Sequence, residues 1–223
     1  MPIICPGWIM TEKLIFILIL IQMLVVPVLA DDKCDDPCMK QVEFIEEKSK
    51  KIDSIRSSFR QVKKLSFMNS EVVSSGVFLF RKDKNKNQVR WEYTSPFSYI
   101  IVIDGDNIVM KDNKKVSRFD MSSSKIFEEI NEILIKSLNG TILTDRKNFS
   151  FEYADKGDEF HVSMVPGKES LKKYLKEIQM VISKKDYAVS LLKMIESSGD
   201  STTLFFTDKK INGNVSGKEF EVK

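Results

Sequence analysis

Short runs of β-forming residues, separated by polar turn sequences, fill most of the chain after residue 70. In Gln88–Tyr93, for example, Val89, Trp91 and Tyr93 alternate with Arg90 and Glu92, which is the period of two expected of a half-buried strand. On this pattern we expect strands at 72–81, 88–93, 97–103, 108–110, 116–119, 149–153, 160–165, 174–182, 187–195 and 201–207. Because the connections are short and polar, consecutive strands should pair antiparallel, and a sheet with so many strands should curl.

Two stretches repeat with the period of a helix instead. Between Met39 and Leu65, apolar residues recur at spacings of three, four and seven, which predicts one long amphipathic helix. A second stripe follows the possible cap serines 122–124 and precedes Asn139-Gly140; it consists of Ile126, Phe127, Ile130, Ile133, Leu134 and Leu138. We therefore expect an α+β fold that is mainly β. Its strongly curved antiparallel sheet of about 9–11 strands forms a half-barrel, and two or three helices cover the concave face.

The first thirty residues are typical of a secretory signal peptide. Lys13 precedes the apolar stretch Leu14–Val26, and small residues lie before a cleavage site after Ala30. The stretch is shorter than the roughly 20 residues that span a bilayer, which favours cleavage and export over a retained anchor. Translation starts at either Met1 or Met10, and the sequence is compatible with both. We expect 31–38 to be a mobile leader and 39–223 to be one folded domain.

Two cysteines remain after cleavage, because Cys5 leaves with the signal peptide. Cys34 and Cys38 lie four residues apart, within reach of a disulfide in an oxidising compartment. Free thiols and a lipid-modified Cys34 are the alternatives. A metal site would need further ligands, and the only histidine, His161, is far away in the sequence. We expect no metal.

Charge and motifs argue against nucleic-acid binding and against catalysis. The formal net charge is +3, with lysines interspersed among acids, so there is no basic stripe of the kind that binds nucleic acid. The sequence has no Gly-x-Ser-x-Gly elbow, no glycine-rich phosphate loop and no His-Glu-x-x-His motif. His161 alternates with Phe160 and Val162, which predicts a histidine on the polar face of a strand. We expect a monomer without enzymatic activity and without a cofactor.

Apolar residues exceed what one covered sheet face requires. In one predicted strand Val77 and Leu79 alternate with Phe78 and Phe80, so both faces are hydrophobic, whereas an antiparallel sheet covered on one side normally alternates. The chain also contains 15 Phe and 10 Met, and methionine adapts to irregular apolar partners. A well-filled core is one explanation of this surplus. The other is a cavity for an apolar ligand.

Several segments, in order, resemble the LolA family of periplasmic lipoprotein carriers. Ser75–Lys82 is similar to the family's first strand, and Arg90-Trp91-Glu92-Tyr93, Pro96 and Ile103-Asp104-Gly105 are similar to its aromatic strand, proline and turn. Leu204–Asp208, Ile211-Asn212 and Phe220 resemble its closing strand and tail. The resemblance covers about residues 40–222 and implies a half-barrel whose helices form a lid over an apolar cavity for lipoprotein acyl chains. It also implies an inner-membrane ABC-type release complex and an outer-membrane acceptor as partners.

On this basis we expect acyl chains to contact an exchangeable stripe on the second helix and the apolar residues of the strands that face it. The predicted lipid-binding residues are Phe78, Phe80, Trp91, Tyr93, Ile101, Ile103, Ile126, Phe127, Ile130 and Leu134. In the family, a basic pair followed by proline supplies the arginine that latches the lid. Here Asp83 replaces that proline, so the residue that corresponds to the latching arginine is either Arg81 or Lys82. Because of this departure, an alternative function is that of a paralogue, which carries another lipid or senses mislocalised lipoproteins. A lipid hydrolase would need a nucleophile and a base that converge in space.

Overall fold

The computed structural model describes residues 36–83, 86–112, 115–121 and 125–222, all of which belong to the unit Cys34–Lys223, one of the two into which the chain divides. Three α-helices and a 3-10 helix are α2 (Asp36–Lys50), α3 (Lys125–Leu138), α4 (Glu169–Lys172) and η2 (Gly217–Phe220). The strands are β1 (Ser54–Lys64), β2 (Glu71–Lys82), β3 (Asn87–Ser95), β4 (Tyr99–Asp104), β5 (Asn107–Asp112), β6 (Lys115–Asp120), β7 (Phe149–Lys156), β8 (Glu159–Pro166), β9 (Leu175–Ser183), β10 (Val189–Glu196) and β11 (Ser201–Ile211).

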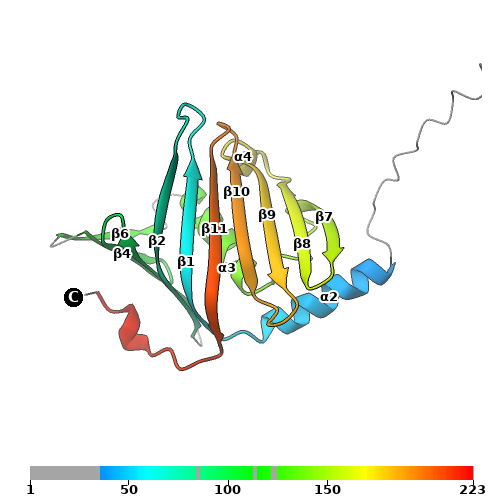
Figure 1. Ribbon diagram of the computed structural model, residues 1–223, viewed down its shortest axis with the longest axis horizontal. Coiled ribbons are helices and arrows are strands. Elements are labelled where there is room, and N and C mark those ends of the chain that lie inside the picture. The colour runs from blue at the N-terminus through cyan, green and yellow to red at the C-terminus, as the bar shows by residue number, and fades with distance from the viewer. Residues whose placement is uncertain (1–35, 84–85, 113–114, 122–124, 223) are drawn as a thin grey trace, which may run out of the picture. The chain divides into compact units, whose positions relative to one another are not determined.

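All of these strands belong to one antiparallel sheet, in the order β6-β5-β4-β3-β2-β1-β11-β10-β9-β8-β7. The chain therefore starts in the middle at β1 and advances by hairpins to the edge strand β6. It crosses through α3 to the opposite edge at β7, and returns by hairpins until β11 pairs with β1. Figure 1 shows the curved sheet with α3 behind it and α2 along the lower ends of β8–β10. The predicted mainly-β architecture, a curved antiparallel sheet with helices, is confirmed.

The prediction of one helix from Met39 to Leu65 is wrong in its second half. Helix α2 ends at Lys50, and Ser54–Lys64 forms β1. The spacing of Ile55 and Phe59 fits one face of a helix, but an even spacing also fits one face of a strand. Between β2 and β11, the strand gains two full ladders of backbone hydrogen bonds, and this tertiary pairing overrides the local pattern. Ser75–Lys82, similar to the family's first strand, accordingly lies in the second strand.

The helix also begins earlier than expected. Asp36 is its first residue, so residues 36–38 of the predicted leader are helical. The predicted signal peptide, 1–30, and the rest of that leader lie outside the described residues.

A long-range contact fixes the joint between α2 and β1. The Asn212 side chain, just after β11, accepts hydrogen bonds from the backbone N–H groups of Asp53 (2.7 Å) and Ser54 (3.3 Å). Its Nδ2 donates to the carbonyl of Lys51 at 3.0 Å. Asn212 adopts a positive φ of 56°, a conformation that asparagine tolerates better than most residues. The end of the sheet thus holds its beginning in place.

The main core lies on the concave face of the sheet. Residues of one parity, such as Phe78, Phe80 and Val89, are fully buried, and cross-strand pairing places them side by side. Val42 and Ile45 of α2 belong to the same cluster. One continuous apolar layer therefore joins both halves of the sheet and the helices.

A second, smaller core lies on the convex face. Leu79 of β2 and Val102 of β4 are buried there against Val215 and Phe220 of the C-terminal segment. This segment is held by an ion pair between Arg56 and Glu219. Leu79 of β2, an apolar strand residue on the second face, is thus covered, whereas Val77 on that same face is exposed. Part of the apolar surplus in the sequence belongs to this packing and not to a ligand cavity.

Candidate lipid-binding face

Aromatic rings form the centre of the concave face. The Phe78 ring centroid lies 4.5 Å from that of Trp91 and 5.3 Å from that of Phe206. Phe59, on the central strand β1, meets Trp91 edge to face at 5.0 Å and Tyr93 at 4.9 Å. These rings come from β1, β2, β3 and β11, which are neighbours in the sheet. The register thus brings residues far apart in the sequence into one apolar surface.

The predicted strand residues all share this face. Cross-strand pairing aligns Phe78 with Trp91 and Trp91 with Ile101, and a parallel row leads from Phe80 through Val89 to Ile103. Each member of these rows is buried or half-buried and belongs to the main core. Tyr93 lies one step further along the same face. The structure therefore brings the predicted strand residues together, and whether they contact lipid stays a prediction.

The helical stripe packs on the same surface less tightly. Ile126, Ile130 and Leu134 of α3 are only half-buried but contact the main core. Ile133 and Leu138, on the same helix, are buried. The side chain of Phe127 lies outside the described residues. Helix α3 therefore covers the concave face with a half-exposed apolar stripe.

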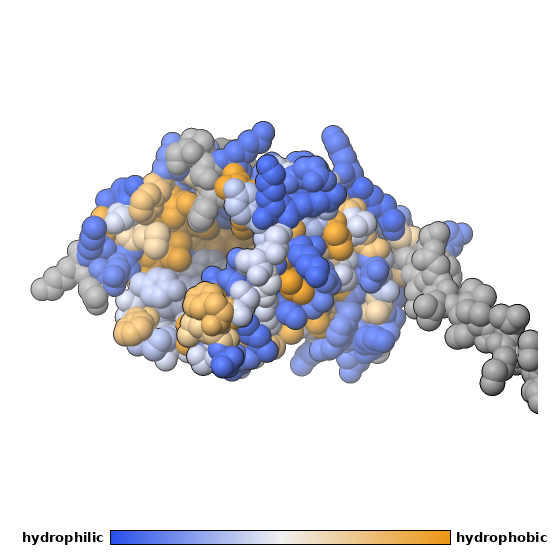
Figure 2. All heavy atoms as spheres, turned by 90° about the horizontal axis from the view of Figure 1, so that it is seen from above, coloured by the Kyte–Doolittle hydropathy of each residue, from blue (hydrophilic) through white to orange (hydrophobic). Residues whose placement is uncertain are grey.

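The space-filling view shows a recess at one end of the half of the molecule that contains β1–β6. Apolar residues gather around it in Figure 2. At the same end of the strands, the tips of two hairpins carry exposed aromatic residues: Phe67 between β1 and β2 is 79% exposed, and Phe97 between β3 and β4 is 78% exposed. The apolar surface thus extends from the interior of the sheet to its rim.

A polar group interrupts this surface near the rim. The Tyr93 hydroxyl donates a hydrogen bond to Gln61 Oε1 at 2.9 Å, and the ring stacks on Tyr99 at 4.1 Å. Burial raises the pKa of Tyr93, and to a lesser extent that of Tyr99, above the ordinary value of a tyrosine. Both hydroxyls therefore stay protonated over the physiological range and can act as hydrogen-bond donors.

The two residues considered for the lid latch have different contacts. Lys82 Nζ donates to the carbonyl of Lys50, the last residue of α2, at 2.6 Å, where a cation is favoured by the helix dipole. Burial lowers the pKa of Lys82. The Cζ atom of Arg81 instead lies 5.8 Å from the ring centroid of Phe220, and its Nη2 lies 3.3 Å from Asp83 Oδ2. Lys82 therefore forms a hydrogen bond with the end of helix α2, whereas Arg81 packs over an aromatic ring of the C-terminal segment.

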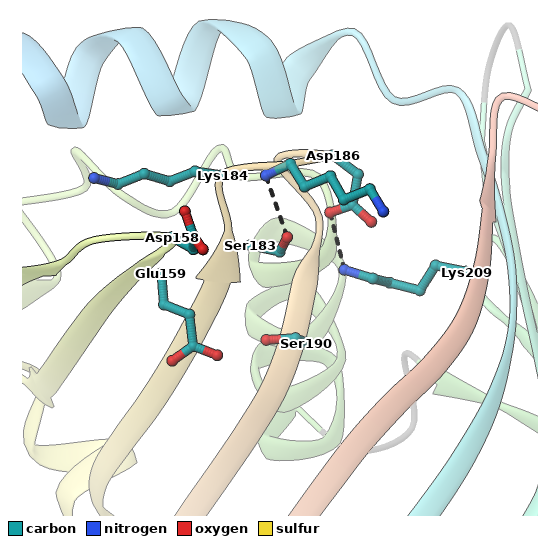
Figure 3. Close-up of a pocket in the computed structure, with 8 residues that line it drawn as sticks. Asp158, Glu159, Ser183, Lys184, Asp186, Ser190 and Lys209 are labelled. Carbon is teal, nitrogen blue, oxygen red and sulfur yellow. Dashed lines mark hydrogen bonds and ion pairs between the residues drawn. The ribbon is translucent and has the colours of Figure 1, made fainter.

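Two pockets have mostly polar linings. One of about 670 Å³ is formed by Asp158, Glu159, Ser183, Lys184, Lys185, Asp186, Ser190 and Lys209. Figure 3 shows Lys209 pointing toward Asp186, with 2.9 Å between Nζ and Oδ1. The other, of about 420 Å³, lies between α3 and the β4–β5 turn and includes Asp106, Glu128 and Lys136. Their charged linings suit ions or water better than acyl chains.

The remaining predicted sites are at the surface or near the start of α2. His161 is partly exposed, and its Nε2 lies 3.0 Å from Glu159 Oε2. Cys38 takes part in a disulfide bond, and its predicted partner, Cys34, lies outside the described residues. Within the described ranges, no cluster of three or more His, Cys, Asp and Glu side chains could hold a metal ion. In that same part of the chain, no helix is long and apolar enough to cross a membrane.

Sequence reasoning missed the contribution of β1 to the face. The helix predicted from Met39 to Leu65 includes Phe59 and Gln61, yet in the structure both contact residues of the predicted site. A signal for a strand is present in the sequence, because every second residue from position 55 to 61 points to the same face of a strand: Ile55, Ser57, Phe59 and Gln61. It was weak because Ser57 and Gln61 are polar.

Comparisons with known proteins agree with this architecture. The family model described as outer membrane lipoprotein carrier protein LolA matches residues 50–223. No curated protein sequence matches the chain.

Similar solved structures include the MucA/MucB complex of Pseudomonas aeruginosa, with 8% identity, a TM-score of 0.49, and coverage of 82% of this chain and 60% of that one. The chain thus spans about three fifths of that relative. Lipoprotein LppX of Mycobacterium tuberculosis has 15% identity, coverage of 82% and 99%, and a TM-score of 0.47. A LolA superfamily protein of Nitrosomonas europaea has 12% identity, coverage of 81% and 97%, and a TM-score of 0.38. The family match over most of its length establishes that the chain belongs to the LolA family of outer membrane lipoprotein carrier proteins.

Proposed function

We propose that the protein is a periplasmic carrier that shelters the acyl chains of lipoproteins on its concave face. The observation that carries this proposal is the continuous apolar layer from β1 to β4, covered by the half-buried stripe of α3. In this proposal the protein receives its cargo from an inner-membrane ABC-type release complex and delivers it to an outer-membrane acceptor. Membership of the LolA family supports both steps.

The physical task of such a carrier is to keep hydrocarbon out of water. Each buried methylene contributes about 0.8 kcal/mol, so a chain of about 16 carbons would cost roughly 13 kcal/mol to expose. A carrier has to offset most of this free energy, but not all of it, because the cargo must leave again. A binding surface that is already covered in the empty protein meets both conditions.

Helix α3 supplies this partial cover. Its residues Ile126, Ile130 and Leu134 pack on the main core and remain half-exposed. An acyl chain that enters the concave face competes with these side chains for the same apolar surface. The free energy of binding is then the difference between the contact of the acyl chain with this surface and the contact of the α3 side chains with it. Because this difference is small, the cargo can be released again.

A charged side chain in the stripe tests the proposal. We expect Ile130→Glu to reduce the extraction of lipoproteins from membrane vesicles by about tenfold or more, because the carboxylate would enter an apolar contact. The measurement is the amount of lipoprotein that the purified full chain releases into solution. Lys125→Glu, at an exposed position of the same helix, adds the same group and should extract normally.

The folded state of each variant is checked by its thermal midpoint. Extraction by a folded Ile130→Glu protein at the wild-type level would refute the carrier role of α3. If the wild-type protein extracts no lipoprotein from the vesicles but binds free fatty acids, the cargo is another lipid and the lipoprotein assignment is wrong.

A further inference from the structure

A buried hydroxyl, that of Ser57, lies in the apolar centre of the concave face. Ser57 lies on β1 between Ile55 and Phe59, with Phe78 as its cross-strand partner, and is only 2% exposed. Its Oγ has no hydrogen-bond partner among the described residues. Buried hydroxyls almost always have one, because an unpaired hydroxyl is unfavourable in an apolar environment. Ser57 is therefore an unused hydrogen-bonding group in the proposed binding surface.

Water does not explain this hydroxyl well. A buried water needs two to four polar partners, whereas the neighbours of Ser57 on β1 and β2 are the apolar side chains of Ile55, Phe59 and Phe78. On β11, the register shift opposite Ser57 contains Asp208 and Lys209, and the Lys209 Nζ already donates to Asp186 and to the carbonyl of Ala188. The hydroxyl alone supplies too few hydrogen bonds to hold one. The Ser57 hydroxyl is thus available to a hydrogen-bonding group that arrives with a ligand.

A second polar position lies on the same face of the same strand. Gln61 is four residues after Ser57, a distance of roughly 13 Å along a strand, and accepts a hydrogen bond from Tyr93. Tyr99 stacks on Tyr93 at this end of the sheet. The face thus offers polar groups near the rim and one more polar group deep among aromatic rings.

We propose that the acyl chain carried by this face bears an oxygen function, a hydroxyl or an ester, part-way along its length. This inference rests on the proposed function. The polar head of the ligand lies near Gln61 and Tyr99, and the oxygen within the chain is hydrogen-bonded to Ser57. An unsubstituted chain would fill the same surface but leave the Ser57 hydroxyl unpaired.

Two fatty acids of equal length test this preference on the purified full chain. Stearic acid and 12-hydroxystearic acid compete with a bound dansylated fatty acid, whose fluorescence reports displacement. For the wild-type protein we expect 12-hydroxystearic acid to bind roughly fivefold more tightly, as one additional buried hydrogen bond allows. Ser57→Ala should abolish this preference or reverse it, because the ligand hydroxyl is then buried without a partner.

The adjacent serine provides a matched control. Ser58 is exposed on the opposite face of β1, so Ser58→Ala should keep the preference. Ser57→Cys retains the side-chain volume but donates only a weak hydrogen bond, and it should lose most of the preference. Since Ser57→Ala removes an unpaired buried hydroxyl, its thermal midpoint without ligand should not be lower than that of the wild type.

The outcomes separate the two proposals. If both acids displace the probe equally from the wild-type protein, or if Ser57→Ala keeps the preference, the role of Ser57 is refuted and the carrier function stands. The same holds if 2-hydroxystearic acid is preferred equally, since its hydroxyl lies beside the head. If neither the dansylated fatty acid nor either competing acid binds to the wild-type protein, the proposed function itself fails.

Discussion

The Tyr153 hydroxyl ties the far edge of the sheet to the segment after α3. It donates a hydrogen bond to the carbonyl of Leu143 at 2.7 Å, and burial raises the pKa of Tyr153 to about 12. The unfolded tyrosine ionises near pH 10, so above that pH the unfolded state loses its proton before the folded state does. The stabilising contribution of this group is therefore fully present below pH 10 and is lost as the pH rises to about 12.

Tyr153→Phe should make this dependence weaker. At pH 8 we expect the variant to be less stable than the wild type by about 1 kcal/mol, because the hydrogen bond to Leu143 is missing. Between pH 9 and pH 11 its free energy of unfolding should fall less steeply than that of the wild type. Urea denaturation at several pH values measures both effects, and parallel pH profiles would contradict the assignment.

At the scale of the element, the C-terminal segment is a structural part of the convex face. Phe220 is 6% exposed and packs with Leu79, Val102 and Val215. Phe220→Ala should lower the free energy of unfolding by about 3 kcal/mol. Because the convex face is separate from the proposed binding face, the affinity for an acyl chain should be unchanged in the folded variant.

The comparison requires urea denaturation and probe displacement on the same samples. Lys218→Ala, an exposed change in the same segment, should affect neither quantity. Weaker binding by a folded Phe220→Ala protein would show that the C-terminal segment contributes to the concave face.

The sequence predicts some elements of this fold better than others, and the reason is the range of the interactions. Strands such as Gln88–Tyr93 alternate so regularly that local periodicity identifies them, and parity then places Trp91 and Tyr93 on one face. Strand β1 is harder to recognise, because the spacing of Ile55 and Phe59 also fits a helix and because β11, one of its two partner strands, lies about 150 residues later in the sequence. The role of Ser57 was invisible for the same reason. A serine shows no local sign that its hydroxyl is buried and unpaired.

At the scale of the whole molecule, the position of each strand in the sheet predicts its resistance to opening. β1 and β11 lie in the middle, with neighbours on both sides, whereas β6 is an edge strand with mostly exposed residues. Backbone amides in β1 and β11 should therefore exchange with deuterium most slowly, and those in β6 fastest. Mass spectrometry of peptides after timed exchange measures this order. Equal protection of β6 and β1 would mean that another molecule covers the edge.

The seam between β1 and β11 also has a consequence for biosynthesis. During translation, β1 (Ser54–Lys64) is made long before β11 (Ser201–Ile211), the strand that completes its other side. Until then the growing chain keeps an open edge in the middle of its future sheet. A domain whose central strand lacks one neighbour until β11 has been made can complete its sheet only after both halves of that sheet have been synthesised.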